Sequence, residues 1–107
     1  GNQMGKEENA SEKNELLKNR MKQEYMNLLQ QEIEDTFDKA EKLKLMNQYL
    51  PFLYEDLKKA GTEAEKSAVT VKLIGYLKQK LELVKDGQEK KKLYDELKQM
   101  ILFEMNR

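Results

Sequence analysis

One cluster of side chains in the sequence has the chemistry to hold a metal ion. It is acidic and consists of Glu32, Glu34, Asp35 and Asp38. Carboxylate oxygens are preferred ligands of calcium and magnesium, but calcium loops place them in a tight turn with glycine, which this stretch lacks. Glu34 and Asp38 are four residues apart, so on a helix they share a face and repel each other. We therefore interpret the cluster as a solvated face and predict neither a metal ion nor another cofactor.

Side chains for covalent or acid–base catalysis are almost absent. The 107 residues include no Cys and no His, and the only serines, Ser11 and Ser67, have no imidazole to activate them. The five glycines are scattered and form no phosphate-binding loop. The sequence predicts that the protein is not an enzyme. The only route to catalysis or metal binding that stays open uses carboxylates alone.

A basic run is a candidate contact for phosphate. Lys90, Lys91 and Lys92 follow one another, and Lys85 lies nearby; such side chains bind anionic nucleic acids. Three consecutive residues of a helix point in three directions, however. The net charge is zero, with 20 basic and 20 acidic residues, whereas nucleic-acid binders usually show a basic excess. These four lysines are a candidate anion contact, and a nucleic-acid-associated accessory protein is the alternative function.

Two apolar segments are candidate partner surfaces. The first surrounds the only proline, Pro51, and is rich in tyrosine and phenylalanine, which are favoured at interfaces. The alternative to a partner surface is that this segment packs in the core and leaves only the tyrosine hydroxyls in water. The second has three consecutive large apolar residues near the C-terminus, which cannot all face one core. We predict a protein partner or self-association through six residues: Tyr49, Phe52, Tyr54, Ile101, Leu102 and Phe103.

The composition favours helices for the elements that position these residues. Leu, Lys and Glu dominate, and these residues favour helices, whereas the β-branched residues of strands are scarce. No apolar run approaches the ~18–20 residues that cross a bilayer. Residues 1–10 contain two glycines and one large apolar side chain, so we predict a flexible lead before a single domain of residues 11–107.

The first helical stretch runs from about residue 11 to 48, with Asn9 or Ser11 near its start. Its apolar stripe is not straight, because the apolar positions rotate by roughly 100° near the middle and then return. Either one helix of ~35 residues contacts different partners along its length, or the helix breaks near residues 34–36. With no Gly or Pro there, we favour a continuous helix. Leu16 and Leu45 are surplus apolar residues on this stretch.

Pro51 predicts a kink or restart, because a helix interior rejects proline, and a short helix over residues 51–60 follows. Thr62 with Glu65 fits a capping box for a helix that runs to about Lys85. The apolar residues of this third helix cover about half its circumference, so we expect it to be central and to contact two neighbours.

Gly75 lies inside that third helix, which indicates either close approach of another helix or an exposed, uncompensated glycine. Asp86 and Glu89 repeat the capping spacing and predict a last helix over residues 88–105. The short connection makes the third and fourth segments antiparallel.

Together these features predict an all-α fold: a small antiparallel helical bundle of three to four helices, with a long first helix and a C-terminal helical hairpin. The function that this combination favours is a non-enzymatic helical protein–protein interaction or oligomerisation module.

Overall fold

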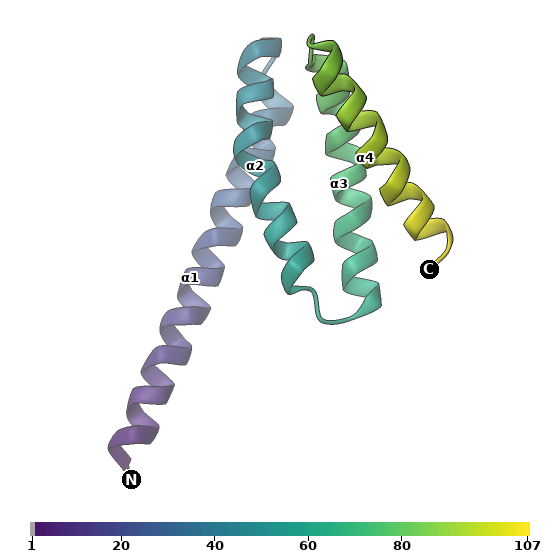
Figure 1. Cartoon of the computed structure of the whole chain (residues 1–107). Coiled ribbons are helices and arrows are strands. Elements are labelled where there is room, and N and C mark those ends of the chain that lie inside the picture. Colours follow the sequence, from purple (N-terminus) through teal and green to yellow (C-terminus); the bar gives the residue numbers. More distant parts are fainter. Residues whose placement is uncertain (1) are drawn as a thin grey trace.

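Residues 2–107 form four α-helices, and the computed structural model describes the backbone of these residues and the side chains of residues 10–107. The helices are α1 (Asn2–Asp35), α2 (Lys39–Lys59), α3 (Glu63–Leu83) and α4 (Gly87–Met105). The predicted all-α bundle is confirmed, with consecutive helices antiparallel (Figure 1). The backbone of α1 begins upstream of the predicted start. Gly1 and the predicted cap side chain of Asn9 lie outside the described part, and the flexibility of residues 1–10 stays a prediction.

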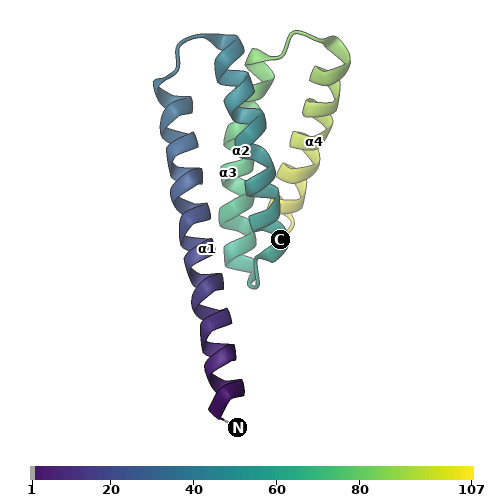
Figure 2. The same cartoon turned by 90° about the vertical axis from the view of Figure 1, so that its left-hand side faces the viewer.

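The helices pack in chain order: α1 against α2, α2 against α3, and α3 against α4. Figure 2 shows α1 and α4 on opposite sides of the α2–α3 pair, so these two helices do not cover each other. The N-terminal half of α1 extends beyond the other helices, which makes the molecule 60 Å long and only 20 Å thick. The expectation that the third helix contacts two neighbours is confirmed, and α2 shares this central position.

The prediction of a continuous helix through residues 34–36 is wrong. α1 ends at Asp35, and α2 begins after Asp38, whose side chain accepts a hydrogen bond from the amide of Ala40 at 3.3 Å. Because the chain reverses direction between the two helices, the buried face of α2 packs against Ile33 and its neighbours on α1. Each large apolar side chain buried in this way stabilises the fold by about 1.5–3 kcal/mol, and several are buried on each helix. Together they outweigh the few helical hydrogen bonds lost at the turn, which contribute about 0.5–1.5 kcal/mol each.

The prediction that the helix restarts at Pro51 is also wrong, because α2 continues through it. Proline has no amide hydrogen to donate to the carbonyl of Asn47, one turn earlier. Both residues are exposed, so water can solvate that carbonyl. Leu50 and Leu53 on the same helix are buried, at 5% and 2% exposed. Tertiary packing of this apolar face therefore holds α2 together across the proline.

Replacing Pro51 by alanine should stabilise the protein. The Pro51→Ala substitution restores the amide donor and removes the clash with the preceding turn, while the exposed ring leaves no cavity. We expect the free energy of unfolding in urea to rise by about 1–3 kcal/mol with an unchanged m-value. An unchanged or lower stability would show that α2 is not helical across residue 51.

The two predicted capping residues of the C-terminal hairpin are confirmed. The hydroxyl of Thr62 accepts from the amide of Glu65 at 3.1 Å, and Asp86 accepts from the amide of Glu89 at 3.1 Å. In a capping box the carboxylate of Glu65 would accept from the amide of Thr62; here it accepts instead from the amide of Gly61, one residue earlier, at 3.0 Å. These caps satisfy amides at the helix starts that have no partner within the helix.

Gly75 does not mark close approach of a neighbouring helix. It is exposed, and a Cβ built there would have no atom within 4 Å outside its own helical surroundings. Gly75 is therefore the exposed, uncompensated glycine that was the other prediction for this position.

The core lies between the helices and contains apolar residues from all four. Of the two residues predicted to be surplus, Leu45 is buried, whereas Leu16 is 65% exposed. At its centre the ring of Tyr49 on α2 meets the ring of Tyr76 on α3 edge-on, with centroids 4.9 Å apart. The buried apolar set is Met26, Leu29, Ile33, Leu45, Met46, Tyr49, Leu50, Leu53, Leu73, Tyr76, Leu77, Val84, Leu93 and Leu97.

Candidate interaction surfaces

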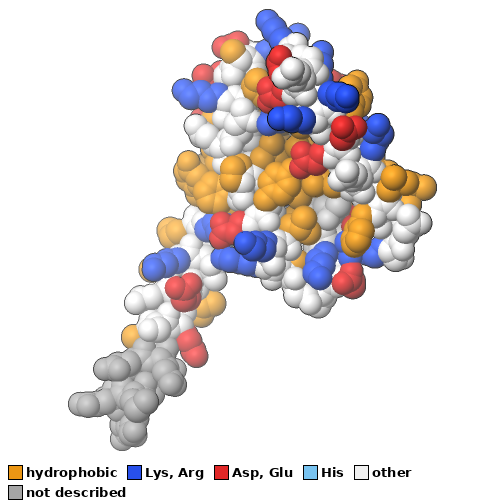
Figure 3. Space-filling model, viewed as in Figure 1, with side chains coloured by type: hydrophobic (Ala, Val, Ile, Leu, Met, Phe, Trp, Pro, Cys, Tyr) orange, Lys and Arg blue, Asp and Glu red, His pale blue; other side chains and the backbone are white. Residues whose placement is uncertain are grey.

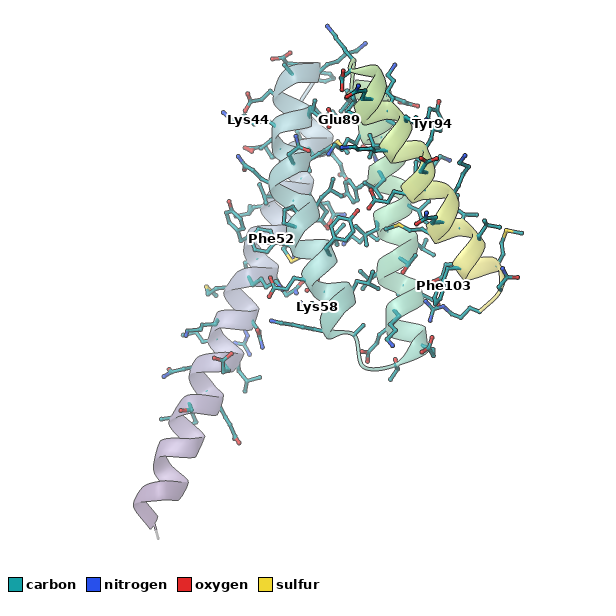
Figure 4. The ribbon with its side chains drawn as sticks, in the orientation of Figure 1. Lys44, Phe52, Lys58, Glu89, Tyr94 and Phe103 are labelled. Carbon is teal, nitrogen blue, oxygen red and sulfur yellow. The ribbon has the colours of Figure 1, made fainter. Side chains whose placement is uncertain are left out.

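The three aromatic residues predicted around Pro51 lie in three different environments. Tyr49 has no exposed surface, so it belongs to the core and offers nothing to a partner. Phe52 is half-buried and packs edge-on against Tyr25 of α1, with ring centroids 5.6 Å apart (Figure 4). Tyr54 is 36% exposed, and its hydroxyl donates to the carboxylate of Glu96 on α4. Through these side chains this part of α2 contacts both α1 and α4. Of the three aromatic residues, only Phe52 and Tyr54 reach the surface.

Ile101, Leu102 and Phe103 are all at the surface, where they are 41%, 56% and 63% exposed. The buried side of α4 follows Leu93, Leu97 and Met100. At about 100° per residue, Tyr94, Ile101 and Met105 lie within about 40° of one another and roughly 90° around the helix from the centre of this buried side. Leu102 adjoins them on the outer side of the helix. We call Tyr94, Ile101, Leu102 and Met105 the α4 face.

Phe103 lies apart from the α4 face, in a hollow between the end of α4 and the α2–α3 pair. Leu57, Thr70 and Met100 line this hollow, and the guanidinium of Arg107 covers the Phe103 ring at 4.9 Å from its centroid. A second hollow lies one to two turns away, where Tyr54 and Glu96 bridge α2 and α4. We call these two hollows the α2–α4 groove. Figure 3 shows apolar side chains in a band across this side of the molecule, bordered by charged groups.

A further apolar surface runs along α1, from its projecting half, where all residues from 10 to 21 are exposed, into the part that lies beside α2. Its members recur at intervals of three or four residues and therefore share one side of the helix. We call this set the α1 face; it consists of Leu17, Met21, Tyr25 and Leu28, which are 56%, 52%, 49% and 63% exposed.

Except at Tyr25, whose ring packs against Phe52 of α2, the α1 face is separate from the side of α1 that packs on the bundle. The buried residues are Met26, Leu29 and Ile33, roughly 120° around the helix from the centre of the α1 face. Lys22 marks where α1 leaves the bundle, since its ammonium contacts Asp56 at 2.9 Å and Glu55 at 3.5 Å on α2. The sequence predicts no partner surface here, although the rotation of the apolar stripe indicates that this helix has two apolar sides.

The four lysines of the candidate anion contact cluster around the α3–α4 turn without forming a basic face. Lys85 lies in the turn, Lys91 and Lys92 are exposed in different directions on α4, and Lys90 is half-buried. Acidic side chains lie among them: Asp86 caps α4, and Glu89 pairs with Lys80 at 3.8 Å. A phosphate backbone would meet charges of both signs here, so the arrangement does not favour nucleic acid.

The acidic cluster is divided by the helix break. Glu32, Glu34 and Asp35 end α1, whereas Asp38 caps α2. No group of three acidic side chains within residues 10–107 is arranged to hold a metal ion. Within the same part of the chain, no helix combines the length and apolar character that a bilayer crossing requires.

Comparison with known proteins does not assign the chain to a family. No family model, no curated protein and no solved structure matches the sequence or its fold. Any function therefore has to be argued from this chain's own surfaces. Among the side chains of residues 10–107, the apolar surfaces considered for a partner are the α1 face, the α4 face and the α2–α4 groove.

Proposed function

We propose that this chain is a non-enzymatic helical interaction module that binds protein chains through its exposed apolar helix faces. The observation that carries the proposal is the α1 face. Leu17, Met21 and Leu28 are each more than half exposed on a helix whose N-terminal half extends past the bundle. Large apolar side chains gathered on one such side mark interaction surfaces in soluble proteins.

The α2–α4 groove and the α4 face support the same proposal. Phe103 is 63% exposed beside the apolar lining from Leu57 and Met100, and Ile101 and Leu102 lie on the adjoining outer side of α4. A groove between two helices with an aromatic residue at its rim is a shape that receives an amphipathic helix. Residue chemistry agrees, since a chain without Cys or His lacks the usual nucleophile and general base of an enzyme.

The proposal is tested by comparing proteins bound from an extract of the source organism by immobilised wild type and by two surface variants. The first variant, Leu17→Glu with Met21→Glu, disrupts the α1 face. The second, Leu102→Glu with Phe103→Glu, disrupts the α4 face and the α2–α4 groove. A matched control, Lys78→Glu with Glu82→Lys, changes an exposed polar part of α3. We expect at least one protein, or further copies of the chain itself, to bind the wild type and the control but not one of the variants.

Circular dichroism must first show that all the variants keep the helical content of the wild type. The proposal fails if the wild type is a strict monomer in sedimentation equilibrium and also retains no protein that either surface variant loses.

A further inference from the structure

We propose that the α1 face is a homodimer interface, on which α1 of a second copy of this chain lies antiparallel. This inference rests on the proposed function, because it names the partner of one of the surfaces described above. It is carried by the distribution of charge along that face, which distinguishes a second copy from other apolar partners.

The α1 face needs a cover more than the other surfaces do. Residues 10–21 of α1 are exposed on every side, so no tertiary contact from those side chains holds this part of the helix. Isolated helices of ~12–15 residues are marginal in water even with favourable sequences. A second helix on the α1 face would bury Leu17, Met21 and Leu28 and would thereby supply the packing that the bundle does not.

Charges beside the α1 face change sign along its length. Around its N-terminal part lie Lys13, Lys18 and Arg20. Within or beside its C-terminal part lie Glu24, Glu32 and Asp35, and all six side chains are exposed. None of the six forms an ion pair with another side chain in residues 10–107.

This gradient is self-complementary only when two copies run in opposite directions. In a parallel pair, the basic part of one α1 would lie against the basic part of the other, and like charges in contact are destabilising. In an antiparallel pair, the basic part of each copy faces the acidic part of its partner. A two-fold axis makes the contact isologous, so every favourable pair occurs twice.

One register satisfies both the apolar and the charged residues. When Leu17 lies opposite Leu28 of the second copy, Met21 lies opposite Glu24 of that copy, and Arg20 is within one turn of the same glutamate. Arg20 can then pair with Glu24, which removes the only charge interrupting the apolar seam. Lys18 comes within one turn of Tyr25 of the second copy, where a cation over an aromatic ring adds attraction.

The bundle leaves most of the α1 face open, because Leu17, Met21 and Leu28 are more than half exposed and only Tyr25 has its ring against α2, at Phe52. Helix α2 lies against the side of α1 that carries Met26, Leu29 and Ile33, roughly 120° from the centre of the α1 face. Each bundle therefore extends away from the shared seam. The bundles lie at opposite ends of the α1 pair, because in each copy α2 packs on the C-terminal half of α1 (Figure 2).

The absence of cysteine from the chain makes direct cross-linking the test of this geometry. Leu17→Cys and Leu28→Cys are prepared separately, mixed and oxidised. In the proposed register the sulfur of one variant meets the sulfur of the other. Two copies of Leu17→Cys would instead hold their sulfurs about 16 Å apart along the helix, well beyond disulfide reach. We expect a covalent dimer from the mixture and none from either variant alone.

A charge exchange tests the interface without a cross-link. Arg20→Glu places two acidic groups together in each half of the interface, and Glu24→Arg places two basic groups together. Each variant alone should dimerise about tenfold or more weakly than the wild type in sedimentation equilibrium. An equimolar mixture should regain the wild-type affinity, because opposite charges then meet at both pairs. Glu12→Arg, an exposed residue on the far side of α1, is the control and should leave the affinity unchanged.

Three results would overturn the inference: a wild type that stays monomeric over the whole concentration series, a cross-link formed by Leu17→Cys alone, or a charge-exchange mixture no tighter than its components. A monomer would leave the proposed function intact, because the extract experiment detects partners other than a second copy. A dimer with no partner lost by the surface variants would limit the function to self-association.

Discussion

Replacing Leu73 by alanine should remove a large part of the stability of this fold. Leu73 has no exposed surface and lies on α3, between α2 and α4. A buried Leu→Ala substitution costs about 2–5 kcal/mol, because it loses the transfer free energy of the removed atoms and leaves a cavity. A domain of this length is stable by roughly 5–15 kcal/mol in total. We expect the free energy of unfolding in urea, followed by circular dichroism, to fall by about 2–5 kcal/mol.

The matched control is Leu16→Ala on the projecting part of α1. Leu16 is 65% exposed and lies to one side of the α1 face, so the same chemical change removes no buried contact. Its effect should stay within ~0.5 kcal/mol of the wild type. If the two variants lost similar amounts of stability, Leu73 would not be at the centre of the core, and the packing of α3 between α2 and α4 would be wrong.

The helix boundaries show what a sequence can predict. Thr62 and Asp86 were found because capping acts within four residues, so both the side chain and its target amide are visible in the local sequence. The break after Asp35 and the passage through Pro51 depend on distant partners. Local rules favour a continuous helix at the first position and a break at the second, and tertiary packing of α2 reversed both.

The candidate surfaces show the same limit. Ile101, Leu102 and Phe103 were predicted to include exposed residues because three consecutive apolar side chains exceed what one core can take, and all three are exposed. Tyr49 was a candidate by composition alone, and only the packing against Tyr76 shows that it is buried. The α1 face could not be predicted from the sequence, because the spacing of its apolar residues is the same as that of a helix side buried in a core. Which of two apolar sides meets the bundle depends on where α2 lies.

Alkaline pH should unfold the protein through its two buried tyrosines. Burial, with a smaller contribution from the charge of Asp56, raises the pKa of Tyr49 to about 12. Burial, with smaller contributions from Tyr49 and Glu34, raises the pKa of Tyr76 to about 12 as well. An unfolded tyrosine ionises near pH ~10. The raised values mean that the folded state holds both phenols neutral over a pH range in which the unfolded state releases their protons.

The difference in tyrosine pKa between the folded and unfolded states determines how stability changes with pH and over which pH range. Below pH ~10 both states are protonated, and the contribution of the two phenols to stability is complete. As the pH rises from about 10 to about 12, the unfolded state is favoured by about 1.4 kcal/mol per pH unit for each tyrosine, or roughly 5 kcal/mol for the pair. This loss is comparable to the lower range of total stability for such a domain. We expect the helical circular dichroism signal and the phenolate absorbance to change together within this window.

Removing the two phenols separates this effect from the titration of other groups. The Tyr49→Phe, Tyr76→Phe double variant keeps the edge-on ring contact at the core but no longer has the two core phenol protons to lose. Its helical signal should therefore persist to higher pH than that of the wild type. Tyr94→Phe, at a 54% exposed position, is the control and should unfold at the same pH as the wild type. If the wild-type tyrosines all ionised near pH ~10 while the helices stayed intact, the phenols of Tyr49 and Tyr76 would be open to water, and the α2–α3 contact at the centre of the fold would be wrong.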